Sequence, residues 1–270
     1  MRSFAVEVRR CLHRRVVWVL VLLALGFGIL GAVISFFSSA GVSEWRLLYE
    51  EGGHPAAMVT WWRGGTEGIL SFAALFFLLG GLFGGASVVG AEWRAGTVTT
   101  GLTWEPRRSR FHLARVGACG ACAFAIAVVL QVLFLGLLSV AVITHGTTLG
   151  VDAAWWGGLV LAVLRISLLA SIAAVVGASL ATIGRNTAFG VMAAFAWMAV
   201  GENLIRGLRP SLEPHLLGEN LSIVLTWAQL DTAEFIRSPG TALAALLLYG
   251  LIVGAAALFS FERRDLASVA

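Results

Sequence analysis

Long uncharged apolar runs alternate with short charged segments along the chain of 270 residues. An α-helix rises about 1.5 Å per residue, so roughly 20 apolar residues cross the hydrocarbon core of a bilayer. Six runs are long enough, the fifth being the shortest, and they predict transmembrane helices over residues 16–37, 68–91, 116–144, 155–184, 187–204 and 238–261. The expected fold is an all-α integral membrane protein in which residues 16–270 form a single transmembrane domain.

The placement of arginine predicts how these helices cross the membrane. Six spans leave both termini on one side, and thirteen arginines lie on that side against five on the other. Acidic residues show the opposite bias, with five on the side of the termini and ten on the other. Because cytoplasmic loops carry the excess of basic residues, both termini are expected in the cytoplasm.

Three segments outside the spans have patterns of their own. Within residues 1–15 one helical face carries the apolar side chains Phe4, Val8, Cys11 and Leu12. This fits an amphipathic helix in the headgroup layer or, equally, a basic flank that only orients the first span. Residues 38–67 predict an external polar loop. Residues 205–237 contain two prolines and an apolar helical face, which fits a re-entrant or interfacial helix or an ordered loop.

Composition supports the membrane assignment and removes several chemistries. Hydrophobic residues make up 59% of the chain and charged residues 13%, whereas soluble domains carry about 25% charged residues. All nineteen basic residues are arginine. Without lysine there is no Walker-type phosphate loop, Schiff base or lysine general base, so any ATP that drives this protein binds another polypeptide. The formal charge is +4, but the placement of the arginines follows the two sides of the membrane. Nucleic acid is therefore not an expected partner.

Cysteine and histidine give no strong signal for a metal or redox site. Cys119 and Cys122 form a CxxC among small apolar neighbours, which favours helix packing. The five histidines are predicted in loops and termini, without a ligand pattern such as HExxH. No metal ligand is expected.

The segment between the second and third spans concentrates charge. It reads GAEWRAGTVTTGLTWEPRRSRFHLAR over residues 90–115 and contains five arginines. Thr97 is a candidate helix cap, Val98 and Leu102 lie on one face of the short helix that follows, and Pro106 ends it. Two interpretations stay open at this point. The segment is either a short helix that docks into the groove of a partner or a solvated hairpin whose arginines hold the topology.

Polar residues inside the spans are candidates for a pathway or for structural pairs. Placing the charged Arg165 side chain in the fourth span costs free energy unless the side chain has a partner or contacts water. Glu202, near the outer end of the fifth span, is the predicted partner in a structural pair, and a role in a substrate pathway is the alternative. Gln131 lies near mid-membrane and either lines a cavity or bonds a neighbouring helix. Two overlapping GxxxG spacings in the second span predict close helix packing, and they are formed by Gly80, Gly81, Gly84 and Gly85.

Several of these features together resemble one protein family. EWRAGTVTTGLTWEPRRSR resembles the cytoplasmic loop of bacterial type-2 ABC-transporter permeases, where a Glu, a Gly-Thr pair, a leucine and a Pro-(x)-Arg follow the second span. IGRNTAFGVMAAFAWMAVGEN, residues 183–203, is similar to their turn between the fourth and fifth spans. The basic N-terminus is similar to their elbow helix, so the resemblance covers essentially the whole chain.

The resemblance implies a six-span permease subunit in the cytoplasmic membrane of a bacterium. Such a subunit dimerises, as a homodimer or heterodimer, and exports cargo with two separate ABC ATPase subunits that bind ATP and magnesium. This chain is expected to bind no cofactor itself. The loop at 96–104 would be the coupling helix that seats in the ATPase, and the loop after the fifth span would be an external re-entrant region. The candidate coupling residues are Glu92, Arg94, Gly96, Thr97, Val98, Thr100, Leu102, Pro106, Arg107 and Arg108.

Two other classes of function compete with this interpretation. An intramembrane enzyme needs a nucleophile with a base, and Ser87 and Ser179 have no histidine in the predicted spans to activate them. An ion-coupled carrier or channel is disfavoured because proton relays use buried Asp, Glu or His, which are scarce in the spans. The chain is therefore not expected to be an enzyme.

Overall fold

The computed structural model describes residues 2–39, 62, 69–145, 148, 151–231 and 236–263. The external polar loop predicted at 38–67 lies largely outside these residues. Within the described ranges, six helices are long and apolar enough to cross a membrane, which confirms a multi-pass α-helical membrane protein.

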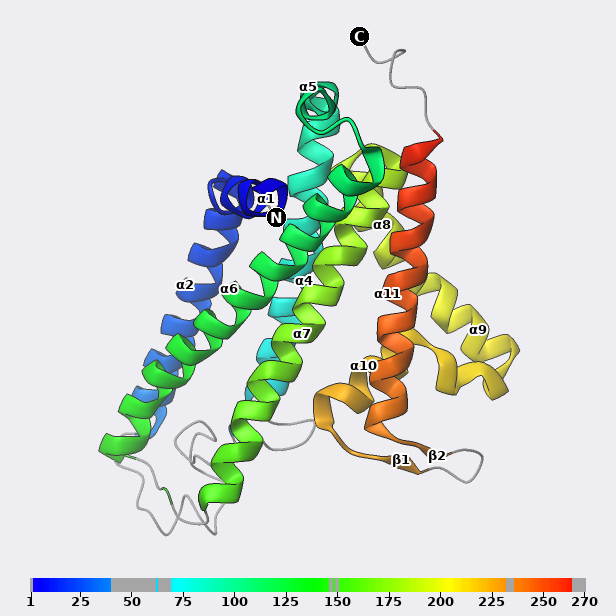
Figure 1. Ribbon diagram of the computed structural model, residues 1–270. Helices are drawn as coiled ribbons and strands as arrows, with labels where there is room; N and C mark the ends of the chain where they lie inside the picture. Colours follow the sequence, from blue (N-terminus) through cyan, green and yellow to red (C-terminus); the bar gives the residue numbers. More distant parts are fainter. Residues whose placement is uncertain are drawn as a thin grey trace.

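The helices follow the order shown in Figure 1. The candidate membrane helices are α2 (Arg15–Ser39), α4 (Ile69–Arg94), α6 (Arg108–His145), α7 (Ala153–Gly184), α8 with α9 (Thr187–Ala196 and Glu202–Leu208) and α11 (Pro239–Glu262). The shorter elements are α1 (Arg2–Leu12), α5 (Thr97–Trp104), a 3-10 turn (Pro210–His215), α10 (Leu217–Thr226), β1 (Leu230–Asp231) and β2 (Ile236–Arg237). The two strands pair antiparallel.

The core of the bundle is the close contact between α4 and α7. A side chain added at Gly81 or Gly85 would collide with the backbone carbonyl oxygens of Ala170 or Ala174, and one at Gly177 would collide with Leu82. Small residues thus let the two backbones meet, as membrane helices require in the absence of a hydrophobic driving force. One of the two predicted GxxxG spacings is therefore a packing face.

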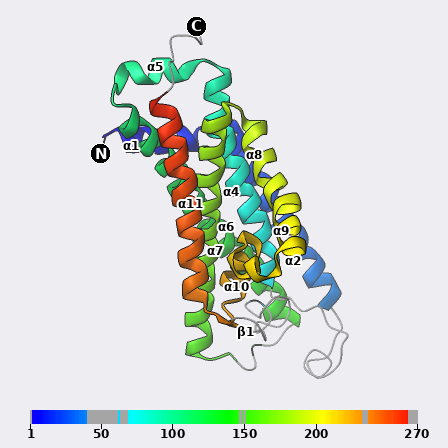
Figure 2. The same cartoon turned by 90° about the vertical axis from the view of Figure 1, so that its right-hand side faces the viewer.

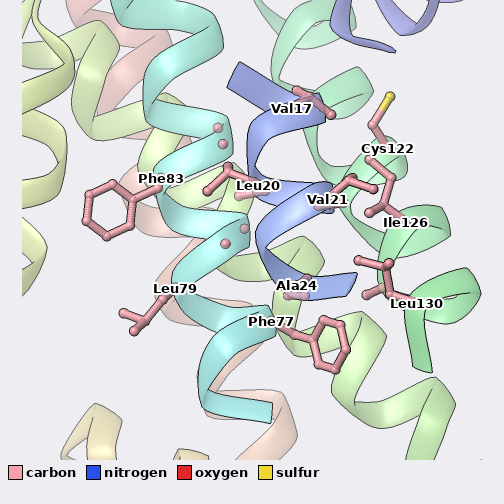
Figure 3. A pocket seen from close by; sticks show the side chains of 18 of the residues that line it. Val17, Leu20, Val21, Ala24, Phe77, Leu79, Phe83, Cys122, Ile126 and Leu130 are labelled. Carbon is pink, nitrogen blue, oxygen red and sulfur yellow. The ribbon is translucent and has the colours of Figure 1, made fainter. Parts of the chain in front are cut away.

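The other GxxxG spacing faces a small cavity. Gly80 and Gly84 have no such backbone contact and line a cavity of about 230 Å³ between α2, α4 and α6. Figure 3 shows Leu20 of α2 directed toward α4, and Val21 of α2 and Ile126 of α6 directed toward one another at this cavity. A Cβ at Gly84 would lie 3.7 Å from the Leu20 side chain of α2, so this spacing does not bring two backbones together as Gly81 and Gly85 do.

Two spans differ from their predicted limits. The third predicted span starts at residue 116, but α6 begins at Arg108 and runs for 38 residues. Proline 106 prevents an earlier start, and nothing after it interrupts helical geometry. The fifth span is not one regular helix, because a π-helical turn at Trp197–Gly201 separates α8 from α9. Such turns locally change the direction of a helix.

Residues 205–237 form several short elements. The end of α9 is followed by the 3-10 turn, which begins at Pro210, and then by α10, which packs on α11 through Val224 and Leu246. The apolar face predicted in this region extends to Ala228. The structure contains this face but ends it earlier, because α10 ends at Thr226 and Ala228 is exposed beyond it.

One end of the bundle carries both α1 and α5. Figures 1 and 2 show these helices lying across the same end at which α11 finishes, whereas α10 and the strands lie toward the opposite end. The N-terminal helix and the end of the last helix are thus on one side of the bundle. The helical prediction for residues 1–15 is confirmed over Arg2–Leu12.

Candidate functional site

The charged segment between the second and third spans forms a helical hairpin. Helix α5 begins at Thr97, after Gly96 adopts a left-handed conformation with φ 66°. Glycine reaches this conformation without the steric cost that other residues bear. Thr97 is not the cap predicted from the sequence, because it is the first helical residue and its hydroxyl donates to the Glu92 carbonyl at 3.5 Å.

The apolar face of α5 packs inward, against this chain. Val98 is only 2% exposed and belongs to a cluster with Trp93, Phe111 and Phe261. Leu102 packs against the same cluster. The Val98 side chain is therefore not exposed to a partner as the docking interpretation expected, whereas Leu102 is half-buried. Their burial fixes α5 rigidly to the ends of α4, α6 and α11.

The opposite face of α5 is polar with one large aromatic side chain. Thr99, Thr100 and Thr103 are exposed, and the Trp104 side chain is 86% exposed. Two of these hydroxyls, on Thr99 and Thr103, are bonded to backbone carbonyls of the helix itself. An exposed tryptophan on a rigid helix is typical of a binding hot spot. Of this face, the predicted set of coupling residues included only Thr100 and missed Thr99, Thr103 and Trp104.

The remaining predicted coupling residues surround α5. Arg94, Pro106 and Arg107 are exposed. Arg108 starts α6 and donates to the Glu262 carbonyl at 3.1 Å, which ties the hairpin to the end of α11. Arg94 and Arg107 thus leave a basic border beside the threonine face.

A buried carboxylate at the base of the hairpin holds three segments together. Glu92 is 4% exposed; Oε1 accepts a hydrogen bond from Arg14, which links α1 to α2, and Oε2 lies 2.6 Å from an Arg115 nitrogen. Arg115, in α6, is 2% exposed and also donates to the Val89 carbonyl at 3.0 Å. Buried charges are tolerated when they are paired and hydrogen-bonded in this way. The Glu92 side chain, predicted to act in coupling, is thus buried within this chain.

Helix α1 adds a second acidic residue close to this cluster. Glu7 is 8% exposed and receives a bond from Arg10 at 2.8 Å. Burial raises the pKa of the Glu7 carboxyl, and the nearby negative charge of Glu92 acts in the same direction, while Arg10 opposes both. Burial in the folded chain therefore favours the neutral form of the Glu7 carboxyl.

The three cysteines lie together under α1. Cys11, Cys119 and Cys122 are all buried free thiols in the apolar cluster, which confirms helix packing. Hydrogen bonding to Cys119, together with burial, raises the pKa of the Cys11 thiol to about 12. Among the described residues, no group of three His, Cys, Asp or Glu side chains is arranged to hold a metal ion.

Gln131 bonds a neighbouring helix, as one of its two predicted roles requires. It is fully buried, and its amide nitrogen donates to Ser167 Oγ at 2.8 Å and to the Val163 carbonyl at 3.3 Å. These bonds join α6 to α7 near the middle of the bundle.

Arg165 and Glu202 do not form the predicted pair. The Glu202 carboxylate accepts from the backbone N–H of Leu217 at 2.6 Å and of Gly218 at 3.0 Å, at the N-terminus of α10. The Arg165 guanidinium lies over the Trp227 ring, 4.6 Å from its centroid, just after α10 ends. The two charges thus sit at opposite ends of α10, each at the end whose helix dipole it complements.

Two histidines, His112 and His145, belong to the candidate membrane helix α6, so the prediction that the histidines lie in loops and termini is wrong for these two. His112 is 3% exposed because α6 starts earlier than predicted, and its ring stacks on Phe261 at 5.4 Å between centroids. The contact is apolar packing between α6 and α11.

The sequence pattern gives Arg14 and Arg115 only a topological role. A signal for Arg115 was present, since it shares a helical face with Cys119 and Cys122, at spacings of four and seven residues. All three are buried in the structure. Arg14 carries no comparable local signal.

Comparison of the chain with protein-family models, curated proteins and solved structures finds no match in any of the three.

Proposed function

We propose that this chain is the transmembrane permease subunit of an ATP-driven ABC exporter. In this proposal two permease subunits enclose the pathway, and separate ATPase subunits press on α5 from the cytoplasm. The observation that carries the proposal is the construction of α5: a short helix anchored by the buried Val98, with a threonine face and an 86% exposed Trp104 directed away from the bundle. A rigid helix of this kind transmits a push to the helices on which it is fixed.

Three further features support the proposal. The absence of lysine assigns nucleotide hydrolysis to another polypeptide. The buried Glu92 cluster, next to α5 in the sequence, joins the end of α4 to Arg14 between α1 and α2 and to Arg115 of α6, so a force on the end of α4 reaches these helices. The arginine bias favours a cytoplasmic location for this end of the bundle, where ATP is available.

Copurification tests the proposed coupling surface. The chain is coexpressed with an ABC ATPase from the same genome, and the retained ATPase is quantified for wild type, Trp104→Ala and Trp156→Ala. Trp156 is 49% exposed near the start of α7, on the opposite side of the bundle, and serves as the matched control. We expect Trp104→Ala to weaken the complex by about 30-fold, the loss of about 2 kcal/mol typical of an interfacial tryptophan. Equal retention by both variants would overturn the proposal.

Orientation is tested independently of the partner. The native cysteines of the chain are buried, so a cysteine introduced by Thr100→Cys is the accessible thiol to label with a membrane-impermeant maleimide. We expect labelling in inverted vesicles and none in intact cells. Labelling in intact cells would place α5 outside and exclude contact with a cytoplasmic ATPase.

A further inference from the structure

A large cavity lies at the opposite side of the molecule from the α2 face. Its volume is about 940 Å³, and it is bounded by α4, α7, α8, α9, α10 and α11. Small-molecule sites in proteins have volumes of about 300–1,000 Å³, so this cavity has the size of a binding site. Figure 2 shows α8 with α9 on one side and α11 on the other, with α10 between them toward one end.

Two hydrogen bonds close this cavity at the α10 end. Glu202 of α9 accepts from the Leu217 N–H of α10, and the Tyr249 hydroxyl of α11 donates to the His215 carbonyl at 2.6 Å. The short elements between α9 and α11 are thereby tied to both walls. The π-helical turn after Ala196 brings Trp197 and Met198 into the lining.

The lining is apolar along the walls and polar at the closed end. Leucine, isoleucine and valine side chains of α4, α7 and α11 make most of the wall surface. The polar side chains of the lining belong to α10, the 3-10 turn and the adjoining parts of α4 and α11, and they are Ser71, His215, Ser222, Thr226 and Tyr249. Among the described residues, no charged side chain is part of the lining. A ligand that fits has a long apolar body and a polar group at one end.

The cavity opens sideways between α8–α9 and α11. Trp197, Met198 and Ile252 line it, and their exposed fractions are 52%, 43% and 55%. Because these helices are candidate membrane spans, the opening faces lipid hydrocarbon. Apolar cavities do not hold water, so hydrocarbon is the filling that matches this surface.

We infer that this cavity binds an acyl chain of one membrane phospholipid, which enters from the bilayer between α9 and α11. The acyl chain of the lipid lies along α7, against Leu169, Ile172 and Val176. The lipid headgroup lies at the α10 end of the cavity. The flexible Met198 side chain adapts to a mobile hydrocarbon chain. This inference does not depend on the proposed transport function.

Photolabelling in nanodiscs tests the inference. The probe is phosphatidylcholine with a diazirine in one acyl chain, and adducts are mapped by peptide mass spectrometry. Ala194→Trp and Val253→Trp fill the cavity from α8 and from α11, and each is an independent variant should the other fail to fold. Ala196→Trp and Ala256→Trp are the matched controls, because these exposed alanines lie on the same helices outside the lining.

The expected result is preferential adduct formation at Met198 and along the cavity face of α11. In each cavity-filling variant that elutes as a monodisperse species, this labelling should decrease about tenfold. A tenfold decrease corresponds to a loss of about 1.4 kcal/mol of binding free energy. The control variants should label as wild type. Adducts confined to outward residues such as Leu251, or unchanged by both filling variants, would overturn the inference. Crosslinked dimers through Met198 would also overturn it, by making a second copy the occupant.

Discussion

Two buried glutamates, at opposite ends of the bundle, are neutralised in different ways. Glu92 and Glu202 are each 4% exposed. Glu92 is bound by the side chains of Arg14 and Arg115, which come from segments far apart in the sequence. Glu202 is bound by the backbone N–H groups of Leu217 and Gly218, fifteen and sixteen residues away. One carboxylate thus joins charged side chains, and the other caps a helix.

The difference determines what each glutamate holds in place. The Glu92 cluster includes the guanidinium of Arg115, which is itself buried. Removal of the carboxylate therefore leaves a buried positive charge without its partner. Glu202 satisfies amides that lie at a helix N-terminus, where α10 offers partial positive charge. The first arrangement supports the hairpin from three sides, whereas the second positions one short helix.

The largest expected effect comes from Glu92→Ala. The substitution leaves Arg115 buried without its partner, which costs about 3–5 kcal/mol of folding free energy. Thermal unfolding in detergent and the yield of monodisperse protein measure the loss. The double variant Glu92→Ala/Arg115→Met removes both charges and should recover much of it. Glu105→Ala, which breaks a partly exposed pair with Arg110 at 3.7 Å, should cost under about 1 kcal/mol. A loss no larger than this control would contradict the central role of Glu92.

A smaller effect is expected from Glu202→Ala. Loss of the cap should cost about 1–2 kcal/mol and speed hydrogen exchange at Leu217 and Gly218. Asn203→Ala is the adjacent control, since the Asn203 amide bonds only the Ala199 carbonyl in the described structure. Because Arg165 and Glu202 do not contact each other, Arg165→Ala combined with Glu202→Ala should be additive within about 0.5 kcal/mol. A larger coupling energy would restore the direct pair predicted from the sequence.

The smallest effect concerns Glu7, the third buried acid. Burial raises the pKa of the Glu7 carboxyl above its ordinary value in the folded chain, so ionisation weakens the folded state as pH rises through the folded pKa. Glu7→Gln should therefore be more stable than wild type at pH 8, and the difference should narrow at pH 5. Melting temperatures at both pH values measure it. The exposed Glu262→Gln is the control and should show no such change, and a difference that widened at pH 5 would reverse the sign assigned to Glu7.

Some features of the bundle could be predicted from the sequence, and others could not. The six spans, the α1 helix, the short α5 helix and the close packing at Gly81 and Gly85 all follow from local apolar periodicity or residue size. The inward direction of Val98 did not follow, because an apolar stripe on a short helix fits a partner's groove as well as the chain's own core. Glu92 was expected to act in coupling because it matches a position in the loop of the resembling family, and no local pattern predicted its burial.

Residue order alone therefore determined which segments leave water and become helices, since that depends on side chains a few positions apart. The tertiary structure decided which charges meet. Arg14 and Glu92 are 78 positions apart, and many other arginines of the chain were equally eligible by charge. Electrostatic attraction depends on the distance between charges and on their burial. The ion pairs are therefore set by the packing of α4 against α7 and α6, which brings particular charged atoms within a few ångströms of one another.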